Sequence, residues 1–180
     1  MTVVVVFESM FGNSHRVAAA IAEGLSPYGE VVLANVNDPA SRAAAESADL
    51  LVVGGPTHVH GMSRPTTRLE AASWGHDASK KLSLEPLAPG TGVREWIATL
   101  ERVPLLCAAF DTRVDIAHVL SGAASGHIER ALTKRGAHAV VDAASFLVSK
   151  DTVLEDGELE KARAWGANVG EASGLVAVGH

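Results

Sequence analysis

The chain has 180 residues, of which 47% are hydrophobic and 20% charged, and its formal net charge is −6. This length and composition are typical of one globular domain with a full hydrophobic core, not of a disordered chain. The negative net charge argues against a nucleic-acid partner, because proteins that bind nucleic acids normally carry a basic surface. Because the sequence carries no membrane-length apolar run and no signal peptide, we expect a cytoplasmic protein that does not bind membranes.

Cys107 is the single cysteine, which excludes an internal disulfide and a cysteine-based metal cluster. It lies in the apolar run of residues 105–110, LLCAAF. A thiol in such a run is expected to be buried and unreactive.

The chain opens with a predicted strand, a short loop and a helix. Residues 3–7 (VVVVF) have the β-branched and aromatic character of a buried strand, and apolar residues recur at helical spacing from 17 to 25. The loop between them, residues 9–14 (SMFGNS), is rich in hydroxyl groups. The first N–H groups of a helix lack internal partners and its dipole favours negative charge, so this loop is a candidate phosphate site. The alternative is an ordinary turn in which the serines only cap the helix.

The remaining predicted elements alternate between strand and helix. The patterns predict strands at 30–36, 49–54, 105–110 and an interrupted region at 139–141 and 144–148, and helices at 40–47, 66–73, 93–102, 128–136 and 159–170. Such alternation indicates a parallel sheet with helices on both faces. We expect a single domain over 1–172, with an exposed insertion at 75–92 and a loose tail at 173–180.

Three predicted loops, 8–14, 55–65 and 111–125, follow strands and are rich in Gly, Ser and Thr or in His. The carboxyl ends of parallel strands meet at one edge of the sheet, where ligands bind in open α/β folds. The three loops are therefore expected to form one site. Within the third loop, residues 121–125 are expected to start a helix, with a ligand-contacting turn as the alternative.

The first loop resembles the phosphate loop of the flavodoxin family, whose pattern is Ser/Thr-x-Thr-Gly-x-Thr/Ser. Here it stands as Ser9-Met10-Phe11-Gly12-Asn13-Ser14. An aromatic residue before the glycine is similar to the FMN-dependent NAD(P)H:quinone reductases of the tryptophan-repressor-binding-protein type. The stretch Gly54-Gly55-Pro56-Thr57, followed by residues 58–62, resembles the superfamily's loop beside the flavin.

This resemblance, which spans roughly residues 2–170, implies a flavodoxin-like α/β fold. Its doubly wound, five-stranded parallel sheet would have the strand order 2-1-3-4-5. It also implies bound FMN, with the phosphate on the first loop and the ring between the other two. The residues implied in cofactor binding are Ser9, Met10, Phe11, Gly12, Asn13, Ser14, Pro56, Thr57, His58, Val59, His60, Gly61, Asp111, Thr112 and Arg113.

Electron-carrying flavodoxins usually hold the ring between aromatic side chains, whereas the second and third loops here carry no Trp or Tyr. The ring is therefore expected to be more open. Arg113 would stabilise an anionic reduced flavin, or else forms a surface ion pair with Asp111 or Asp115. Of the three tryptophans, Trp96 and Trp165 are expected in the core, and Trp74 is the candidate for a position near the site.

His58 and His60 are expected either to hydrogen-bond flavin or substrate or to be solvated loop residues. No third ligand is evident near them, so no metal site is predicted.

The function expected from the resemblance is electron transfer by an FMN-binding redox protein, with a redox partner protein or a small-molecule acceptor. One alternative is an NAD(P)H:quinone-type oxidoreductase, and another is a module that has lost flavin and serves as a binding partner. A phosphorylation receiver of the same topology needs an aspartate after the third strand, where Gly54-Gly55 stands.

Overall fold

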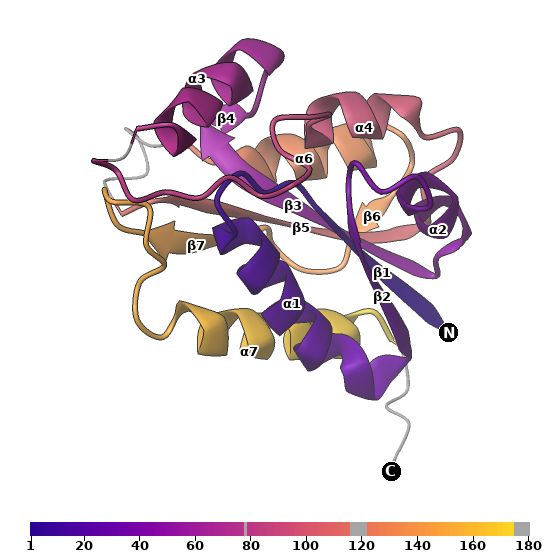
Figure 1. The fold of residues 1–180 in the computed structure, drawn as a ribbon. Helices are drawn as coiled ribbons and strands as arrows, with labels where there is room; N and C mark the ends of the chain where they lie inside the picture. The colour runs from indigo at the N-terminus through magenta and orange to yellow at the C-terminus, as the bar shows by residue number, and fades with distance from the viewer. Residues whose placement is uncertain (78, 116–121, 175–180) are drawn as a thin grey trace.

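The computed structural model describes residues 1–77, 79–115 and 122–174. Its centre is a parallel sheet in the order β2-β1-β3-β5, shown in Figure 1. These strands are β1 (Thr2–Phe7), β2 (Glu30–Asn35), β3 (Leu50–His58) and β5 (Leu106–Val114). The outer position beside β5 is shared by β6 (His138–Ala139) and β7 (Ala144–Val148), which pair with its first and second halves. The predicted doubly wound order and the interrupted last strand are confirmed.

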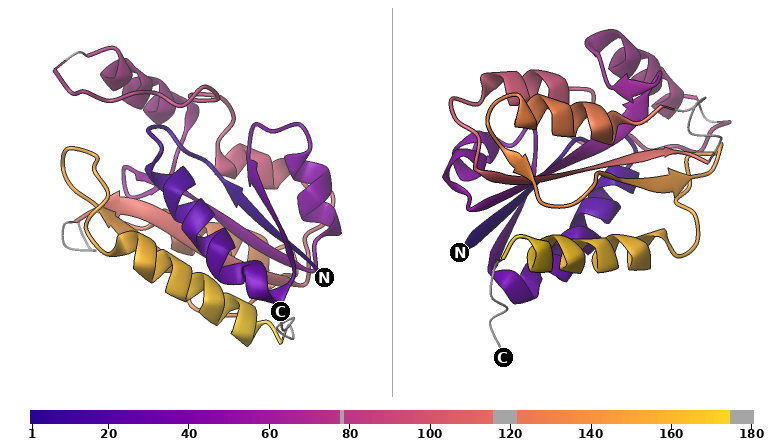
Figure 2. Two further views of the ribbon diagram at one scale, coloured as in Figure 1. Left: turned by 60° about the horizontal axis from the view of Figure 1, so that its bottom comes forward. Right: turned by 180° about the vertical axis from the view of Figure 1, so that it is seen from behind.

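Helices cover both faces of the sheet, as Figures 1 and 2 show. One face packs against α1 (Asn13–Leu25) and α7 (Glu158–Ala172), which lie side by side. The other packs against α2 (Ser41–Ser47), α4 (Val93–Thr99) and α6 (Ala124–Thr133). Successive strand residues point to opposite faces, so Val3 and Val5 enter the first core while Val4 and Val6 enter the second. A single turn of 3₁₀ helix, Ser26–Tyr28, links α1 to β2.

Two strands run further than the sequence predicted, because parallel pairing continues past the apolar residues. Gly55 is paired in register with Asp111, and Pro56 with Thr112. Residues 55–58 and 111–114 were predicted as loop and are in fact strand. The first part of each expected loop is therefore held in the sheet, while residues 116–121 lie outside the described part of the chain.

The strand β3 ends in a tight hairpin to β4 (Gly61–Met62), which pairs with it antiparallel. The two connecting residues, Val59 and His60, have φ angles of 43° and 70°. This left-handed region is normally occupied by glycine or asparagine in such turns. The hairpin leads into α3 (Pro65–Gly75), which stands at the carboxyl edge of the sheet, away from the other helices (Figures 1 and 2).

The segment predicted as an insertion lies against the first loop. Among its described residues, 76–77 and 79–92, no helix or strand is formed. The Glu85 N–H donates to the Met10 carbonyl at 2.9 Å, and Leu84 and Ala88 pack against the small cluster that Met10 forms with Ala71 and Ala72. The segment therefore connects α3 to α4 across the outer side of the loop. The expected loose tail lies, from residue 175 onward, outside the described residues.

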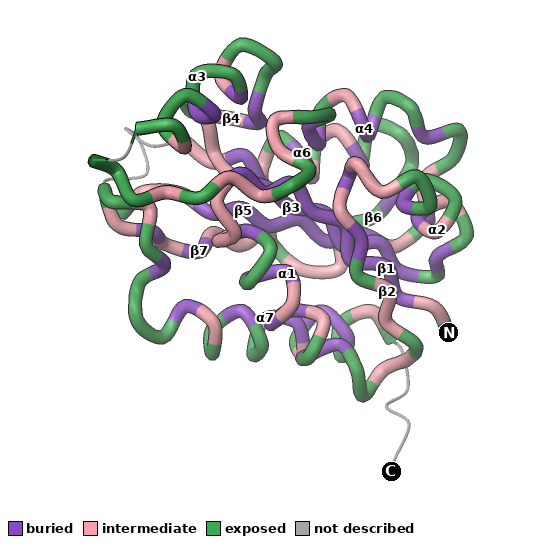
Figure 3. Tube along the Cα trace, in the orientation of Figure 1, coloured by how far each residue is buried: buried purple, intermediate pink, exposed green. Residues whose placement is uncertain are grey.

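The burial pattern in Figure 3 agrees with the sequence expectations for the core. Cys107 is fully buried in β5, and burial raises the pKa of its thiol to about 11, so it is expected to be unreactive. Trp96 is buried, and Trp165 packs edge-to-face against Phe110 and Phe146. No helix in the described part of the chain is long and apolar enough to span a membrane.

The close approach of α1 and α7 generates a stability prediction. A Cβ atom on Gly24 would lie 2.1 Å from the Arg163 carbonyl oxygen of α7. We expect Gly24→Ala to lower the free energy of unfolding by about 2–3 kcal/mol, because backbone must move to relieve the clash.

Gly126 in α6 is the matched control, since a Cβ atom there meets nothing within 4 Å. Gly126→Ala is expected to stabilise by about 0.5–1 kcal/mol through the lower conformational entropy of the unfolded chain. Urea unfolding of both variants measures the difference, and equal effects of the two substitutions would contradict the packing argument.

Candidate functional site

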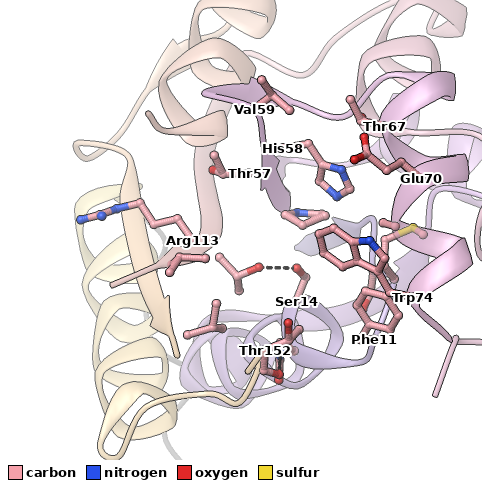
Figure 4. Close-up of a pocket in the computed structure, with 18 residues that line it drawn as sticks. Phe11, Ser14, Thr57, His58, Val59, Thr67, Glu70, Trp74, Arg113 and Thr152 are labelled. Carbon is pink, nitrogen blue, oxygen red and sulfur yellow. Dashed lines mark hydrogen bonds between the residues drawn. The ribbon is translucent and has the colours of Figure 1, made fainter. Parts of the chain in front are cut away.

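A pocket of about 240 Å³ opens at the carboxyl edge of the sheet (Figure 4). Its walls come from the first loop and the start of α1, the ends of β3 and β5, helix α3, and the segment around β7. The lining residues are Ser9, Met10, Phe11, Asn13, Ser14, Pro56, Thr57, His58, Val59, Thr67, Glu70, Ala71, Trp74, Thr112, Arg113, Val114, Val148 and Thr152.

The first loop meets the pocket at the N-terminus of α1. Gly12 precedes the helix with φ 91°, and its N–H donates to the Ser9 hydroxyl at 3.0 Å. The helix has no side-chain cap and no acidic residue in its first turn. Its N-terminal N–H groups and dipole therefore favour an anion at this end of the pocket.

Two hydrogen bonds tie this loop to other walls of the pocket. The hydroxyls of Ser14 and Thr112 lie 2.7 Å apart, which links α1 to the end of β5 (Figure 4). The Asn13 amide donates to the Thr152 carbonyl at 2.7 Å. Thr152 has φ 62°, an uncommon conformation for a β-branched residue, so this contact holds a strained turn in place. Thr152 was not predicted from the sequence.

The opposite side of the pocket is formed by the end of β3 and one face of α3. Thr67, Glu70, Ala71 and Trp74 follow the i, i+3, i+4, i+7 spacing of one helix face, and all four line the pocket. Trp74 therefore brings an aromatic ring to the site from a helix, beside Phe11 (Figure 4). This helical spacing can be read from the sequence, and it is the signal that could have placed these residues on the same face as Trp74.

His58 points into the pocket from β3, toward the carboxylate end of Glu70 (Figure 4). Burial lowers the pKa of His58, and the charge of Arg68 contributes to the lowering, although a hydrogen bond with the Thr67 backbone opposes it. A histidine with a lowered pKa is neutral at neutral pH, so its ring can both donate and accept a hydrogen bond.

Four of the residues implied by the resemblance do not line the pocket. Gly12 forms the turn before α1, while His60 and Gly61 belong to the hairpin, where His60 bridges to Gly122. Asp111 is fully buried, and its carboxylate accepts the Ser125 N–H at 2.7 Å. Arg113 does line the pocket, and its guanidinium extends away from the centre (Figure 4).

The histidines of the second loop do not form a metal site in the described structure. No group of three or more potential metal-ligating side chains was found among residues 1–77, 79–115 and 122–174.

A polar cluster lies next to the first loop and consists of the buried residues Glu8, Ser63 and Arg68 and the partly exposed Glu95. We call it the Arg68 cluster. The Arg68 side chain is buried, donates to the Ser63 hydroxyl at 2.8 Å and lies 3.1 Å from a Glu95 carboxylate oxygen. Glu8 accepts the Val93 N–H at 2.8 Å. Burial raises the pKa of Glu8, although hydrogen bonds with Ser63 and Val93 and the charge of Arg68 oppose this shift.

No protein-family model matches the chain, and no curated protein matches it. Solved structures do. An archaeal flavodoxin matches with a TM-score of 0.64 at 18% identity, covering 97% of this chain and 99% of that one. Flavodoxin 1 from Bacillus cereus matches with a TM-score of 0.64 at 19% identity, over 95% and 98%. A WrbA-like flavodoxin protein from Agrobacterium tumefaciens matches with a TM-score of 0.57 at 19% identity, over 96% of both chains.

These matches define the architecture as a flavodoxin-like α/β fold that extends over nearly the whole chain. At such low identity they establish the fold alone. The predicted fold class is thereby confirmed, whereas the chemistry of the pocket depends on its own residues.

The Arg68 cluster generates a pH-dependent stability prediction. The pKa of Glu8 is higher in the folded chain than in the unfolded chain, so the unfolded chain releases this proton first as pH rises. Ionisation therefore favours the unfolded chain, and the free energy of unfolding falls. Glu8→Gln keeps an acceptor for the Val93 N–H without this loss. We expect the variant to gain stability over the parent at about pH 7.5, and the gain to shrink toward about pH 4, where the acid is protonated in both states.

Denaturant unfolding across this pH range measures the difference. Glu23→Gln, at an exposed carboxylate paired with Arg163, is the control and should show little effect. A Glu8→Gln variant that loses more stability at about pH 7.5 than at about pH 4 would show that pairing with Arg68 outweighs burial.

Proposed function

We propose that the chain binds FMN in this pocket and acts as a flavodoxin-like redox protein in electron transfer. The observation that carries the proposal is the uncapped N-terminus of α1, which opens into the same pocket that Trp74 and His58 wall on its other side. One end of the pocket thus favours an anion and the other offers an aromatic surface. FMN combines a phosphate with a flat ring system and matches both ends.

The residues at the phosphate end fit this cofactor. Ser9, Asn13 and Ser14 line the pocket there with hydroxyl and amide groups. The nearby carboxylate of Glu85 is hydrogen-bonded to the His15 ring, with its Oε1 2.8 Å from Nδ1. Anionic ligands are favoured by such an arrangement of helix N–H groups and polar side chains.

The residues at the ring end fit as well. Trp74 provides aromatic surface, and the Pro56 and Thr57 backbone continues β3 along the pocket wall. When bound, FMN would supply the capacity to accept and release electrons. The protein's part would be to hold the ring, limit water around it and offer the neutral His58 ring as a hydrogen-bonding and proton-exchanging group.

The likeness to flavodoxins supports this proposal at the level of the fold. Electron transfer requires either a redox partner protein or a small-molecule acceptor. Val59, at 77% exposure, puts apolar surface at the rim of the pocket, to which either could be apposed. We propose that this takes place in the cytoplasm.

An NAD(P)H:quinone-type oxidoreductase is the second candidate. It is favoured by the position of His58 in the pocket, because an acceptor that takes up electrons and protons needs a group within reach that gives it a proton and takes one up from water in exchange. The carrier and the enzyme differ in one assay. FMN-loaded enzyme should be reduced by NADH or NADPH without a separate reductase, whereas a carrier should be reduced slowly or not at all under the same conditions.

The phosphate end of the site is tested by comparing FMN with riboflavin, which lacks the phosphate. We expect the parent protein to bind FMN more tightly than riboflavin. Ser14→Asp should weaken FMN binding by about 100-fold or more through charge repulsion, while Ser14→Ala should weaken it about 10-fold through loss of one hydrogen bond.

Riboflavin affinity serves as the internal control, because neither substitution removes a group from the ring end. Asp also suits the first turn of a helix and can still accept the Thr112 hydroxyl, so the fold is expected to be kept. Fluorescence titration measures both affinities. A colourless protein that cannot be reconstituted with FMN would overturn the proposal and leave the flavin-free binding module.

A further inference from the structure

Helix α3 carries one wall of the pocket but has a weak apolar attachment to the rest of the domain. Its buried residues are Arg68, Ala71 and Ala72, while Leu69 is 64% exposed. Two alanines bury little apolar surface, so the hydrophobic contribution to holding this helix is small. The largest buried side chain of α3 is therefore a charged one.

The head group of that side chain is held through its two terminal nitrogens. Its two terminal nitrogens reach different groups, the Ser63 hydroxyl at 2.8 Å and the Glu95 carboxylate at 3.1 Å. The same Glu95 oxygen also accepts the Gly92 N–H at 3.0 Å. A planar guanidinium can make both contacts at once, which a lysine ammonium on its flexible stem does not reproduce.

The chain around the guanidinium is shaped to admit it. A Cβ atom on Gly92 would lie 2.2 Å from Arg68 Nη1 and 2.6 Å from the Ser63 hydroxyl. The absence of a side chain at this position therefore lets the start of α4 approach the head group closely. The carboxyl group of Glu8, which follows β1, belongs to the same cluster and shares the Ser63 hydroxyl as a hydrogen-bonding partner.

We propose that Arg68 is a positioning residue that fixes helix α3 against the end of β1 and the start of α4, and thereby sets the place of Trp74 in the pocket. Residues 68 and 74 share one helix, so a shift at Arg68 moves Trp74 with it. The inference rests on the proposed function in so far as Trp74 contacts the flavin ring. The attachment of α3 itself is a property of the chain alone.

The test uses Arg68→Lys, which keeps the charge but loses the two-branched geometry, and Glu95→Gln, which keeps the shape but loses the charge of the partner. Val169→Ala, at a buried residue of α7, is the control for a general loss of stability. In the flavin-free full chain, hydrogen exchange of α3 should become at least about 10-fold faster in the first two variants relative to the parent. In Val169→Ala it should not be selectively faster.

The second arm measures FMN and riboflavin binding in a double-mutant cycle with Trp74→Leu. We expect Arg68→Lys and Trp74→Leu each to weaken both ligands by about 10-fold, because both act on the ring end. Combined, they should weaken binding little more than either alone, since Arg68 acts through Trp74.

The outcomes separate the two proposals. Unchanged α3 exchange in both Arg68→Lys and Glu95→Gln, or losses of affinity that simply add in the cycle, would overturn the role of Arg68. If the parent protein binds no FMN, the proposed function fails, while the exchange measurement still decides whether Arg68 holds α3. Should Arg68→Lys not fold, Glu95→Gln carries the same comparison.

Discussion

The parallel pairing of β3 with β5 is the constraint on which the site depends. Pairing in register from Leu50 with Leu106 to Pro56 with Thr112 carries both strands beyond the apolar core. Because β1 pairs with the other side of β3, the first loop is delivered to the same edge. The contact between Ser14 and Thr112 then joins the start of α1 to the end of β5. The position of the pocket thus depends first on strand length and register, and only then on individual side chains.

The two ends of the pocket are built from different physical elements. The anion-favouring end uses backbone N–H groups and a helix dipole, which depend on the path of the chain. The aromatic end uses side chains on α3, whose position depends on the contact of the buried Arg68 with the partly exposed Glu95. Such ion pairs contribute little net stability, but the guanidinium is specific in geometry, so it suits a helix that must be placed accurately.

Much of the architecture could be predicted from the sequence. Alternating apolar strands and amphipathic helices fix the class of sheet, and the turn from residue 9 to residue 14 identifies the anion-favouring loop. The lengths of β3 and β5 could not be predicted, because Gly55, Pro56 and Asp111 disfavour strands locally and only cross-strand pairing keeps them extended.

The aromatic wall could be predicted only in part and its support was missed, for related reasons. Trp74 was expected near the site only on grounds of chain position, since its role depends on how α3 packs. Arg68 stands in a polar stretch that is typical of a solvated helix surface, and Glu95 belongs to a different helix. Contacts between charged residues that are distant in the sequence leave no periodic pattern, so the pairing of these two residues could not be predicted.

The hairpin between β3 and β4 has a consequence for how this chain tolerates change. A β-branched residue in the left-handed region costs roughly 1–2 kcal/mol, and Asn-Gly is the pair that suits such a turn. Val59 occupies that strained position and exposes its apolar side chain at the rim of the pocket. At this residue, relieving the backbone strain and keeping apolar surface at the pocket rim are therefore alternatives. Replacing Val59 by asparagine would favour the folded state but would remove the apolar side chain from the rim.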